Sequence, residues 1–413
     1  TAVAEERSGF FEPVLLCERD VQARGYLKKA HPKARIVTEA WELTIALLQE
    51  LGVQVLHAST SCTSFSPAGN QRGLKEADAN VLFHVLHLAK NMDDGKGAVM
   101  FSFENVREIV NHVHKDDFKG FIERMLPNHH VSVGHVQAAA TVNPYDQEGA
   151  ALVSHMRLWI FAVRKDKFAD ILEVDSLPRC EPAGNAEHVM EKDCERSGAY
   201  NVMPQHDQHF LLPVERPMYA RPTPGMKAPF YYVTHRIADA PEKTIGTGVF
   251  PSKVVDLRRG LCPTLTSHSW PWVVDTLHGK TVMRQLTHVE AQRCYGLTMS
   301  WQEQPPALDN VFWRRQISQC VPQTVANART HAFFQALTTV DSEGETPLNR
   351  IKRGENLKGK PPAHVAASVN ALFENPAQDL LPHVPAQSPG WSPKLDQFDL
   401  QNMTHRGRHI CAR

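Results

Sequence analysis

The chain has 413 residues, of which 42% are hydrophobic, so it can bury a sizeable core in one large domain or in two to three smaller ones. Lys plus Arg and Asp plus Glu each total 45, which excludes a globally basic nucleic-acid binder and leaves only a local basic face for such a partner. We expect no membrane segment and no signal peptide, because no apolar run approaches the roughly 18 residues that span a bilayer and the opening residues lack a signal-peptide pattern.

The first half of the chain alternates apolar strands with helices. After a helix-like opening, TAVAEERSGF, we predict strands in EPVLLCERD, VQVLHA, GAVMFSFENV, HVSVGHVQAAA and MRLWIFAVRKD, and helices in ANVLFHVLHLAKNM and FKGFIERML. This alternation predicts an α/β fold with a parallel or mixed sheet covered by helices. Ligands of such sheets bind beyond the carboxyl ends of the strands, so we expect a site in the loops after Cys17, Ala58 and Phe103.

The periodic pattern ends near residue 167, which predicts a domain boundary. Residues 167–279 are rich in Pro, Gly, His and aromatic residues and suggest a second, irregular domain. Regular structure resumes over 280–340, where Thr287 can cap one helix and VPQTVANARTHAFFQALTTV forms a last helix. We therefore expect a sheet domain built from 1–166 and 280–340, followed by a flexible tail over 341–413.

Polar residues that can do chemistry follow several of the predicted strands. Glu18 ends the first strand, Cys62 lies in the small-residue loop STSCTSFSPAG after the second, Glu104 ends the third, and Arg157 begins a later one. A thiol, a carboxyl and a guanidinium at one sheet edge could form a site. Each also has a simpler interpretation. Cys62 could be a packed thiol and Glu104 a solvated carboxylate. Arg157 could extend its charged end to solvent from an edge strand, and Glu18 could form a surface ion pair with Arg19.

Five motifs in order resemble the core of the cytosine-5 DNA methyltransferase family. The first two, SCTSFSPAG and FENV, resemble the family's Pro-Cys-Gln-x-Phe-Ser-x-x-Gly and Glu-Asn-Val. SHMRLWIFAVRKD resembles its Gln-x-Arg-x-Arg strand, MRQLTHVEAQRCYGL its Arg-x-Leu-Thr-x-x-Glu-x-x-Arg-x-x-Gly, and WRRQISQCVPQTVANA its Gln-x-Gly-Asn-x-Val-Pro. The resemblance covers roughly residues 1 to 340. It implies a Rossmann-like, S-adenosylmethionine-dependent methyltransferase sheet, with 167–279 as a smaller target-recognition domain.

The chemistry of this family explains the residue types. Cytosine C5 is a poor nucleophile until a thiolate adds at C6, and Cys is the side chain best suited to that addition near neutral pH. The resemblance implies that Cys62 is the nucleophile, that Glu104 is the acid facing N3, and that Arg157 anchors the ring carbonyl O2. It also implies that Glu18 binds the ribose hydroxyls of S-adenosylmethionine. The base must leave the duplex to reach such a pocket.

The resemblance further implies contacts and partners. The implied cofactor contacts are Ser61, Leu82, Gln319 and Val321, and the implied substrate contacts are Ser66, Asn105 and His155. DNA is the expected partner, and we expect a monomer. The eight cysteines include no CxxC pair, so we expect a reducing intracellular compartment, the nucleus or the nucleoid.

Several positions depart from the family pattern. Ser61 replaces the Pro before the nucleophile, Thr63 the following Gln, His155 the first Arg of its strand, and Ser318–Gln319 the Gly-Asn pair. The Phe-x-Gly-x-Gly loop would precede Thr1, so we expect an N-terminally truncated chain. These departures favour one alternative, a catalytically impaired DNA-binding remnant. An RNA cytosine-5 methyltransferase is a second, although the Cys-Phe-Thr signature of the tRNA-modifying branch is not visible, and an unrelated α/β protein is a third.

One further cluster could bind a metal. Cys180, Cys194, His206 and His209 could supply zinc ligands. Structural zinc sites usually begin with a short Cys-x-x-Cys, which this cluster lacks. We therefore expect no metal.

Overall fold

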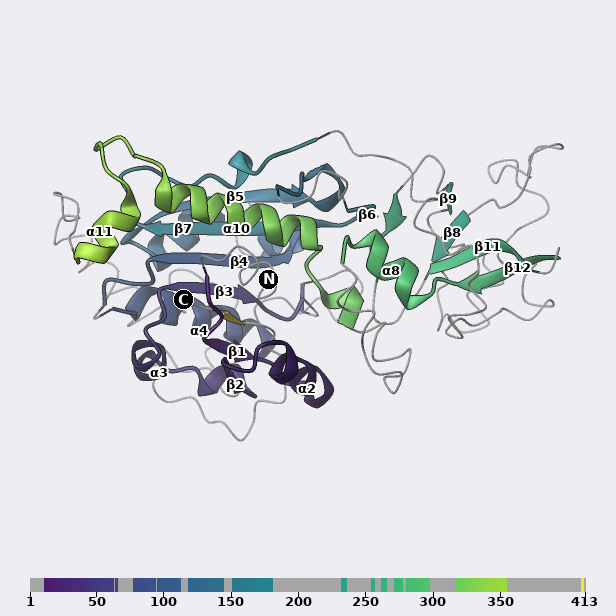
Figure 1. Ribbon diagram of the computed structural model, residues 1–413, viewed down its shortest axis with the longest axis horizontal. Helices are drawn as coiled ribbons and strands as arrows, with labels where there is room; N and C mark the ends of the chain where they lie inside the picture. Colours follow the sequence, from purple (N-terminus) through teal and green to yellow (C-terminus); the bar gives the residue numbers. More distant parts are fainter. Residues whose placement is uncertain are drawn as a thin grey trace. The chain divides into compact units, whose positions relative to one another are not determined.

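The structure is a computed structural model of the whole chain (Figure 1). It describes residues 11–62, 64–65, 77–93, 95–112, 118–144, 151–180, 261–265, 286–297 and 316–354, together with the backbone of short strands within 232–285 and at 410–411. The predicted opening helix lies outside these residues. The chain divides into a first unit, Thr1–Val136, Met156–Leu177 and Arg329–Arg413, and a second unit, Gln137–His155 and Pro178–Ala328.

The first unit contains two sheets. A two-stranded parallel sheet pairs β1 (Leu15–Cys17) with β2 (Arg35–Val37). The larger sheet runs in the order β13 (Ile410–Cys411), β3 (Val55–Ser59), β4 (Met100–Val106), β7 (Met156–Arg164), β5 (His129–Gln137). Because β3 pairs with β4 in parallel and β4 with β7 antiparallel, the predicted mixed sheet is confirmed. All five strands predicted in the first half of the chain are present.

Helices and short 3-10 turns cover the first unit. The α-helices are α2 (Val21–Ala30), α3 (Ile45–Glu50), α4 (Ala77–Asn91), α5 (Phe118–Met125) and α10 (Gln323–Thr338), and the 3-10 turns include η1 (Ala40–Glu42), η3 (Arg107–His112) and η5 (Val174–Ser176). The predicted α4, α5 and α10 are confirmed. Neither α2 nor α3 was anticipated, because each is short, and α2 buries only Ala23 and Leu27. Their caps fix where they begin: Asp20 accepts from two backbone N–H groups of α2.

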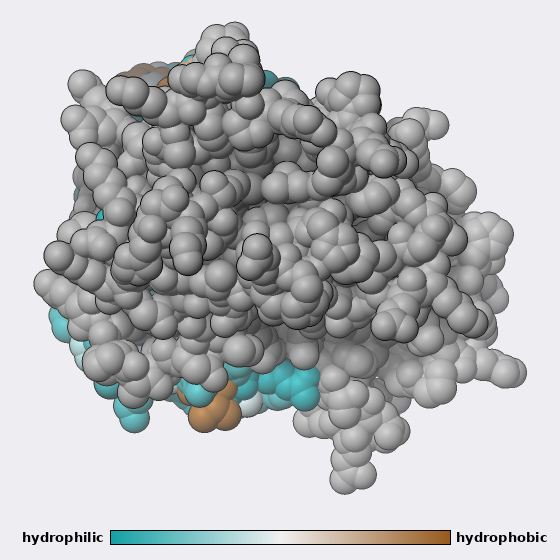
Figure 2. Space-filling view, turned by 90° about the vertical axis from the view of Figure 1, so that its right-hand side faces the viewer, coloured by the Kyte–Doolittle hydropathy of each residue, from teal (hydrophilic) through white to brown (hydrophobic). Residues whose placement is uncertain are grey.

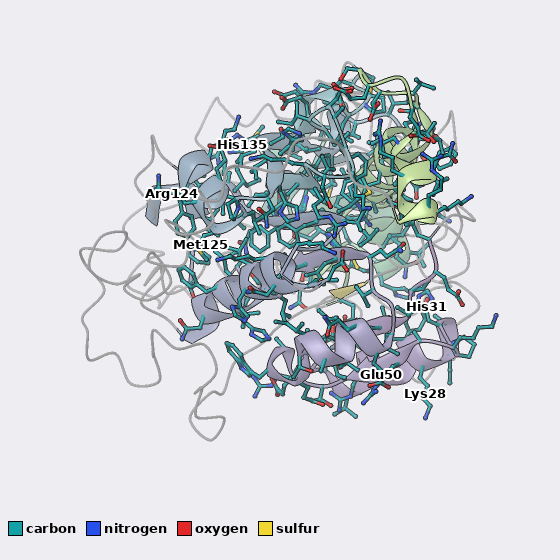
Figure 3. All side chains as sticks on the ribbon, turned by 90° about the vertical axis from the view of Figure 1, so that its left-hand side faces the viewer. Lys28, His31, Glu50, Arg124, Met125 and His135 are labelled. Carbon is teal, nitrogen blue, oxygen red and sulfur yellow. The ribbon has the colours of Figure 1, made fainter. Side chains whose placement is uncertain are left out.

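The sheet is buried on both faces. One face packs against α3, α4 and α5, in a core that includes Leu86, Phe101 and Ile160. Met125, the last residue of α5, packs into the same core (Figure 3). The same view shows Lys28, an exposed residue near the end of α2. The opposite face carries Trp159 and Phe161, and α10 covers part of it because Phe333 meets Phe161 edge-on at 5.3 Å between ring centroids.

The second unit contains an antiparallel sheet in the order β12 (Lys280–Gln285), β11 (Pro271–Leu277), β8 (Tyr232–His235), β9 (Val254–Asp256). The parallel pair β6 (Val153–Ser154) and β10 (Cys262–Pro263) and the helix α8 (His288–Cys294) also belong to it. Thr287 caps α8 in a capping box with Glu290, as predicted. The strands differ from the irregular pattern expected over 167–279, because they are short and lie among Pro- and Gly-rich segments that hide their period.

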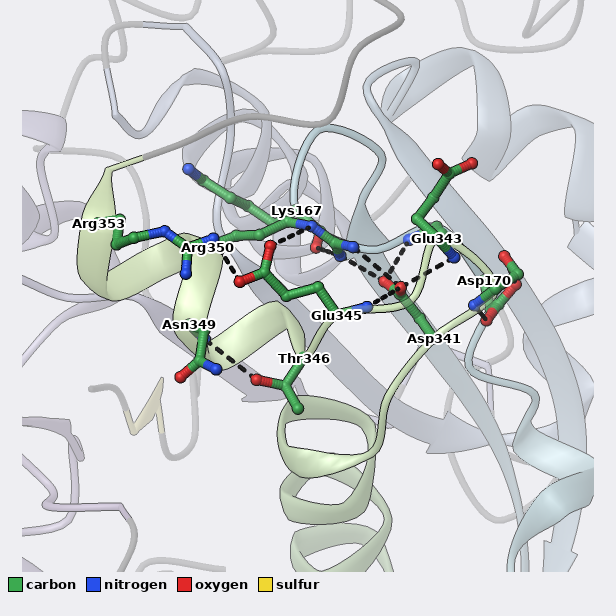
Figure 4. Close-up of polar contacts among 11 residues, drawn as sticks. Lys167, Asp170, Asp341, Glu343, Glu345, Thr346, Asn349, Arg350 and Arg353 are labelled. Carbon is green, nitrogen blue, oxygen red and sulfur yellow. Dashed lines mark hydrogen bonds and ion pairs between the residues drawn. The ribbon is translucent and has the colours of Figure 1, made fainter.

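The start of the expected tail is folded. After Asp341, the helix α11 (Pro347–Arg353) begins at the N-cap Thr346 and ends at Gly354, whose φ of 69° is a left-handed C-cap. Arg350 of α11 is buried and pairs with Asp341 (Figure 4). The prediction of a flexible tail differs from the structure over 341–354. It rests on the amino-acid composition of the whole stretch up to residue 413, and one short, well-capped helix does not stand out in that average. Residues 355–409 lie outside the described part.

The described surface is mostly polar. In Figure 2, the described residues that can be seen along the lower edge are mostly hydrophilic and lie beside one small hydrophobic area. The exposed large apolar residues among those described are Val21, Met156, Ile171 and Val340. Within the part of the chain that the structure describes, every helix is too short or too polar to cross a bilayer.

Candidate active site

Strand register brings the candidate residues onto one face of the large sheet. Ser59, the last residue of β3, lies opposite Glu104 of β4, and Glu104 lies opposite Trp159 of β7. Arg157 lies opposite Val106, two positions further along β4. Directly opposite residues share a face and successive residues alternate, so these side chains all lie on the face that also carries Phe161.

Glu104 is held by two neighbours. Its side chain is only 8% exposed, so the interpretation of a solvated strand-end carboxylate does not hold. Nε of Arg157 lies 3.1 Å from Oε1 of Glu104, and the Ser59 hydroxyl donates a hydrogen bond to Oε2. The pair of Arg157 and Glu104 is diagonal across the antiparallel ladder, which a side chain as long as Arg can span. The predicted carboxyl and guanidinium therefore meet.

A buried polar and aromatic layer lies beside Glu104 on the same face. His57 is fully buried, and its Nδ1 lies 2.8 Å from the hydroxyl of Ser102, its register partner on β4. Its ring stacks against Trp159, with centroids 5.8 Å apart and planes 19° from parallel. Trp159 is 1% exposed, so it forms a rigid wall next to the carboxyl of Glu104.

The loop after β3 holds Cys62 close to this edge. The backbone N–H of Phe65 donates to the carbonyl of Cys62 at 3.0 Å, which closes a tight turn, and Phe65 is buried in the core. Ser61 is 2% exposed, whereas Cys62 is half-buried and packs against the core. The fixed turn therefore presents the thiol with part of its surface open.

Asn105 ties this loop to β4. Its amide nitrogen donates to the hydroxyl of Thr60 at 3.0 Å and to the Thr60 carbonyl at 3.3 Å, and its amide oxygen accepts from the N–H of Val106. The side chain is 1% exposed. The structure thus gives Asn105 a role in positioning the Cys62 loop, while its expected contact with substrate stays a prediction.

Cys17 shows what an unreactive thiol looks like in the same unit. It is 1% exposed, and burial, followed by the neighbouring carboxylate of Glu18, raises the pKa of its thiol far above the ordinary value. The thiolate is the nucleophilic form, so Cys17 serves as a packing residue. The partly open Cys62 is the better candidate of the two.

The loop after β1 fixes a second carboxylate. Glu18 is 5% exposed and accepts a hydrogen bond from the N–H of Asp20 at 2.8 Å. Nη1 of Arg24 donates to the carbonyls of Glu18 and Arg19, and Nε of Arg19 lies 3.1 Å from a carboxylate oxygen of Glu39. Arg19 thus pairs with Glu39 rather than with Glu18, and the Glu18 carboxylate has a fixed orientation.

The other predicted contacts lie elsewhere. Leu82 of α4 is fully buried in the core of the first unit. His155 belongs to the second unit, where its ring meets that of Tyr295 at 5.7 Å between centroids, and Gln319 and Val321 also belong to that unit. Ser66 lies outside the described residues. The roles given to these five residues remain predictions.

The metal cluster can be tested only in part. Cys180 is described, while Cys194, His206 and His209 are not. Among the described residues, no three His, Cys, Asp or Glu side chains are grouped so as to hold a metal ion.

Comparison with known families identifies the segment that carries this geometry. Residues 2–132 match the model of the C-5 cytosine-specific DNA methylase family. This segment is a C-5 cytosine-specific methylase domain. The match confirms the family expected from the motifs, and it includes Glu18, Cys62 and Glu104, whereas Arg157 lies beyond it.

Two solved structures of methyltransferases are similar to this chain. A triple mutant of DNMT2 from Spodoptera frugiperda superposes with a TM-score of 0.51 at 14% identity, covering 80% of this chain and 95% of that one. The methyltransferase EhMeth from Entamoeba histolytica gives 0.48 at 13% identity, covering 78% and 90%. A comparison with curated proteins found no match. The similarity to the DNMT2 structure supports the α/β fold.

Sequence reasoning missed the partners that hold the candidate site residues in place. Ser59 and Thr60 read as loop residues, and His57 as one position of an apolar strand. The available signal was the presence of His57 and Ser102 inside two otherwise apolar strands. Buried polar groups need partners, so two such residues in neighbouring strands predict a pair.

Proposed function

We propose that this protein is a cytosine-5 methyltransferase that acts on DNA and uses S-adenosylmethionine as the methyl donor. The observation that carries the proposal is the buried Glu104, held between Ser59 and Arg157 beside the loop of Cys62. That combination of thiol, carboxyl and guanidinium is what the chemistry at a cytosine ring requires, and it lies at the carboxyl ends of β3 and β4, where ligands of such sheets bind.

The residues after β1 fit the proposed methyl donor. A buried, oriented carboxylate such as Glu18 is chemically suited to accept hydrogen bonds from vicinal ribose hydroxyls, since a carboxylate offers about four lone-pair sites. We propose that Glu18 holds the ribose and that the buried Ser61 lies near the donor. When bound, S-adenosylmethionine supplies the methyl group that is transferred to C5.

The chain's own residues activate the base. The Cys62 thiolate forms a bond to C6, and the ring's electrons move toward N3, where Glu104 donates a proton or a hydrogen bond. Arg157 uses Nε for Glu104, and its planar guanidinium carries further donors that can reach the carbonyl O2 of the ring. Once C5 carries the methyl group, loss of the C5 proton breaks the bond between Cys62 and C6 and regenerates the thiolate.

The setting of the site follows from the same chemistry. A thiol nucleophile must stay reduced, and the cysteines that the structure describes are all free. We therefore propose that the protein works in a reducing intracellular compartment, the nucleus or the nucleoid, where its DNA substrate lies.

Trapping with a fluorinated base tests the proposal. DNA that carries 5-fluorocytosine should form a covalent adduct with the full chain, because C5 cannot lose fluorine as it loses a proton, and the adduct should require both Cys62 and S-adenosylmethionine. The variant Cys62→Ala is the negative control, and Cys17→Ala, which removes a buried thiol instead, should still form the adduct. A matching RNA strand makes the choice of nucleic acid an outcome. DNA binding with a steep salt dependence and no adduct would refute the enzyme and indicate a binding remnant.

A further inference from the structure

Both oxygens of the Glu104 carboxyl are engaged in the structure. Arg157 pairs with Oε1, and the hydroxyl of Ser59 donates to Oε2. Ser59 is also the register partner of Glu104 in the parallel ladder of β3 and β4, so the backbone fixes the distance between the two residues. The contact therefore follows from the pairing of the strands and does not depend on a mobile loop.

We infer that Ser59 is a positioning residue that governs the proton held by Glu104 during methyl transfer, an inference that rests on the proposed function. The two partners of Glu104 differ in chemistry. The guanidinium of Arg157 can only donate, so it stays on an unprotonated Oε1. The Ser59 hydroxyl can donate to an ionised Oε2 and, after rotation, accept from a protonated Oε2.

This difference assigns the proton to one oxygen. Arg157 excludes it from Oε1, and Ser59 can satisfy Oε2 in either protonation state, so the carboxyl can give up and regain a proton without moving. The plane of the carboxyl is then set by these two partners on opposite oxygens, and the proton on Oε2 is the one available to the base.

The position of Ser59 in the sequence supports a role beyond folding. The hydroxyl of the next residue, Thr60, is already engaged by Asn105, which anchors the loop. The described partner of the Ser59 side chain is the carboxyl of Glu104. Loss of the Ser59 hydroxyl should therefore leave the loop anchored and change only the carboxyl.

Steady-state kinetics of methyl transfer over a range of pH test the inference, with Ser59→Ala and Ser59→Thr compared with the unaltered chain. We expect Ser59→Ala to lower kcat about tenfold, the effect of one lost hydrogen bond to a charged group, and to leave KM for DNA within about twofold. Its kcat profile should move to higher pH, because the ionised carboxylate loses a donor. Ser59→Thr, which keeps a hydroxyl, should restore both.

Two controls separate positioning from stability. Ser132→Ala removes the same type of bond elsewhere in the first unit, since Ser132 donates to Glu173 at 2.6 Å, and it should leave the kcat profile unchanged. In a chain that already carries Glu104→Gln, Ser59→Ala should cause no further loss, because the two residues act as one.

The outcomes are distinct. An unaltered chain that forms the 5-fluorocytosine adduct, with a Ser59→Ala variant of unchanged kcat and pH profile, overturns the inference and leaves the proposed function standing. Additive losses from Ser59→Ala and Glu104→Gln overturn it as well. If the unaltered chain forms no adduct, the proposed function fails and this role of Ser59 fails with it.

Discussion

The buried ion pair of Asp341 and Arg350 holds α11 against the first unit, and its removal should be costly. The side chains are only 6% and 5% exposed, and Nη2 of Arg350 lies 2.9 Å from Oδ1 of Asp341. Nη1 of Arg350 also pairs with Asp341 and donates to the carbonyl of Lys167 at 3.1 Å, as Figure 4 shows. This pair is therefore bidentate and desolvated.

The size of the effect follows from this geometry. The hydrogen bond from Arg350 lowers the pKa of Asp341 from 3.8 to about 2, which corresponds to about 2 kcal/mol of interaction with the ionised carboxylate. Asp341→Asn also leaves the guanidinium buried without its counter-charge, so we expect a loss of about 3–5 kcal/mol. Glu345→Gln is the comparison variant. Glu345 pairs with Arg353, with side chains 31% and 46% exposed, and lies 3.8 Å from Nε of Arg350, a longer contact than that of Asp341, so its loss should cost only about 1 kcal/mol.

Urea unfolding of the full chain, combined with hydrogen exchange over residues 329–354, measures both variants. The double variant Asp341→Asn with Arg350→Met should recover part of the loss, because no unpaired charge remains. Since the pKa of Asp341 is lower in the folded state, the stabilisation is present above about pH 3.8 and is lost as the pH falls toward 2. Equal destabilisation by Asp341→Asn and Glu345→Gln would refute this account of the pair.

Three further predictions test the fold by the free energy of unfolding. Gly97 has a φ of +96°, and an added Cβ would lie 2.4 Å from the ring of His129, so Gly97→Ala should cost about 3 kcal/mol. Gly95→Ala is the control: Gly95 has a φ of +82° and open space around it, so its substitution should cost only about 1 kcal/mol. Equal costs would contradict the predicted clash. Burial lowers the pKa of His129 to about 4, so the folded state binds fewer protons than the unfolded state and stability should fall by up to about 3 kcal/mol from pH 6.5 to 4. His129→Asn should flatten that slope, and an unchanged slope would exclude His129 as its cause. Thr287→Ala removes the cap of α8 and should cost about 1 kcal/mol, with a neutral result arguing against the capping box.

Strand identity could be predicted from the sequence because β3, β4 and β7 are mostly apolar runs. The partners of the site residues could not. The bonds from Ser59 to Glu104 and from His57 to Ser102 each join residues 45 positions apart, and they exist only because β3 and β4 pair in one register. A shift of one residue would place these side chains on the opposite face.

Short capped elements escaped prediction for a different reason. The helix α2 turns few apolar residues inward, so its period is weak and its start is set by the cap of Asp20. The helix α11 is seven residues long and is held by a buried ion pair rather than by an apolar stripe. Periodicity detects burial of apolar faces, and neither helix depends mainly on that.

The two arginines of β7, at opposite ends of the strand, differ in how their neighbours hold them. Arg164 is 2% exposed, pairs with Asp93 and Asp166, and donates to the carbonyl of Gly97. Arg157 pairs with a single carboxylate, donates through Nη1 to the carbonyl of Met156, and keeps 18% of its side chain exposed. A guanidinium buried between two carboxylates is fixed inside the protein, whereas one that shares a single carboxylate and stays partly open leaves room for a ligand. The same residue type at opposite ends of one strand thus differs in exposure because its neighbours differ.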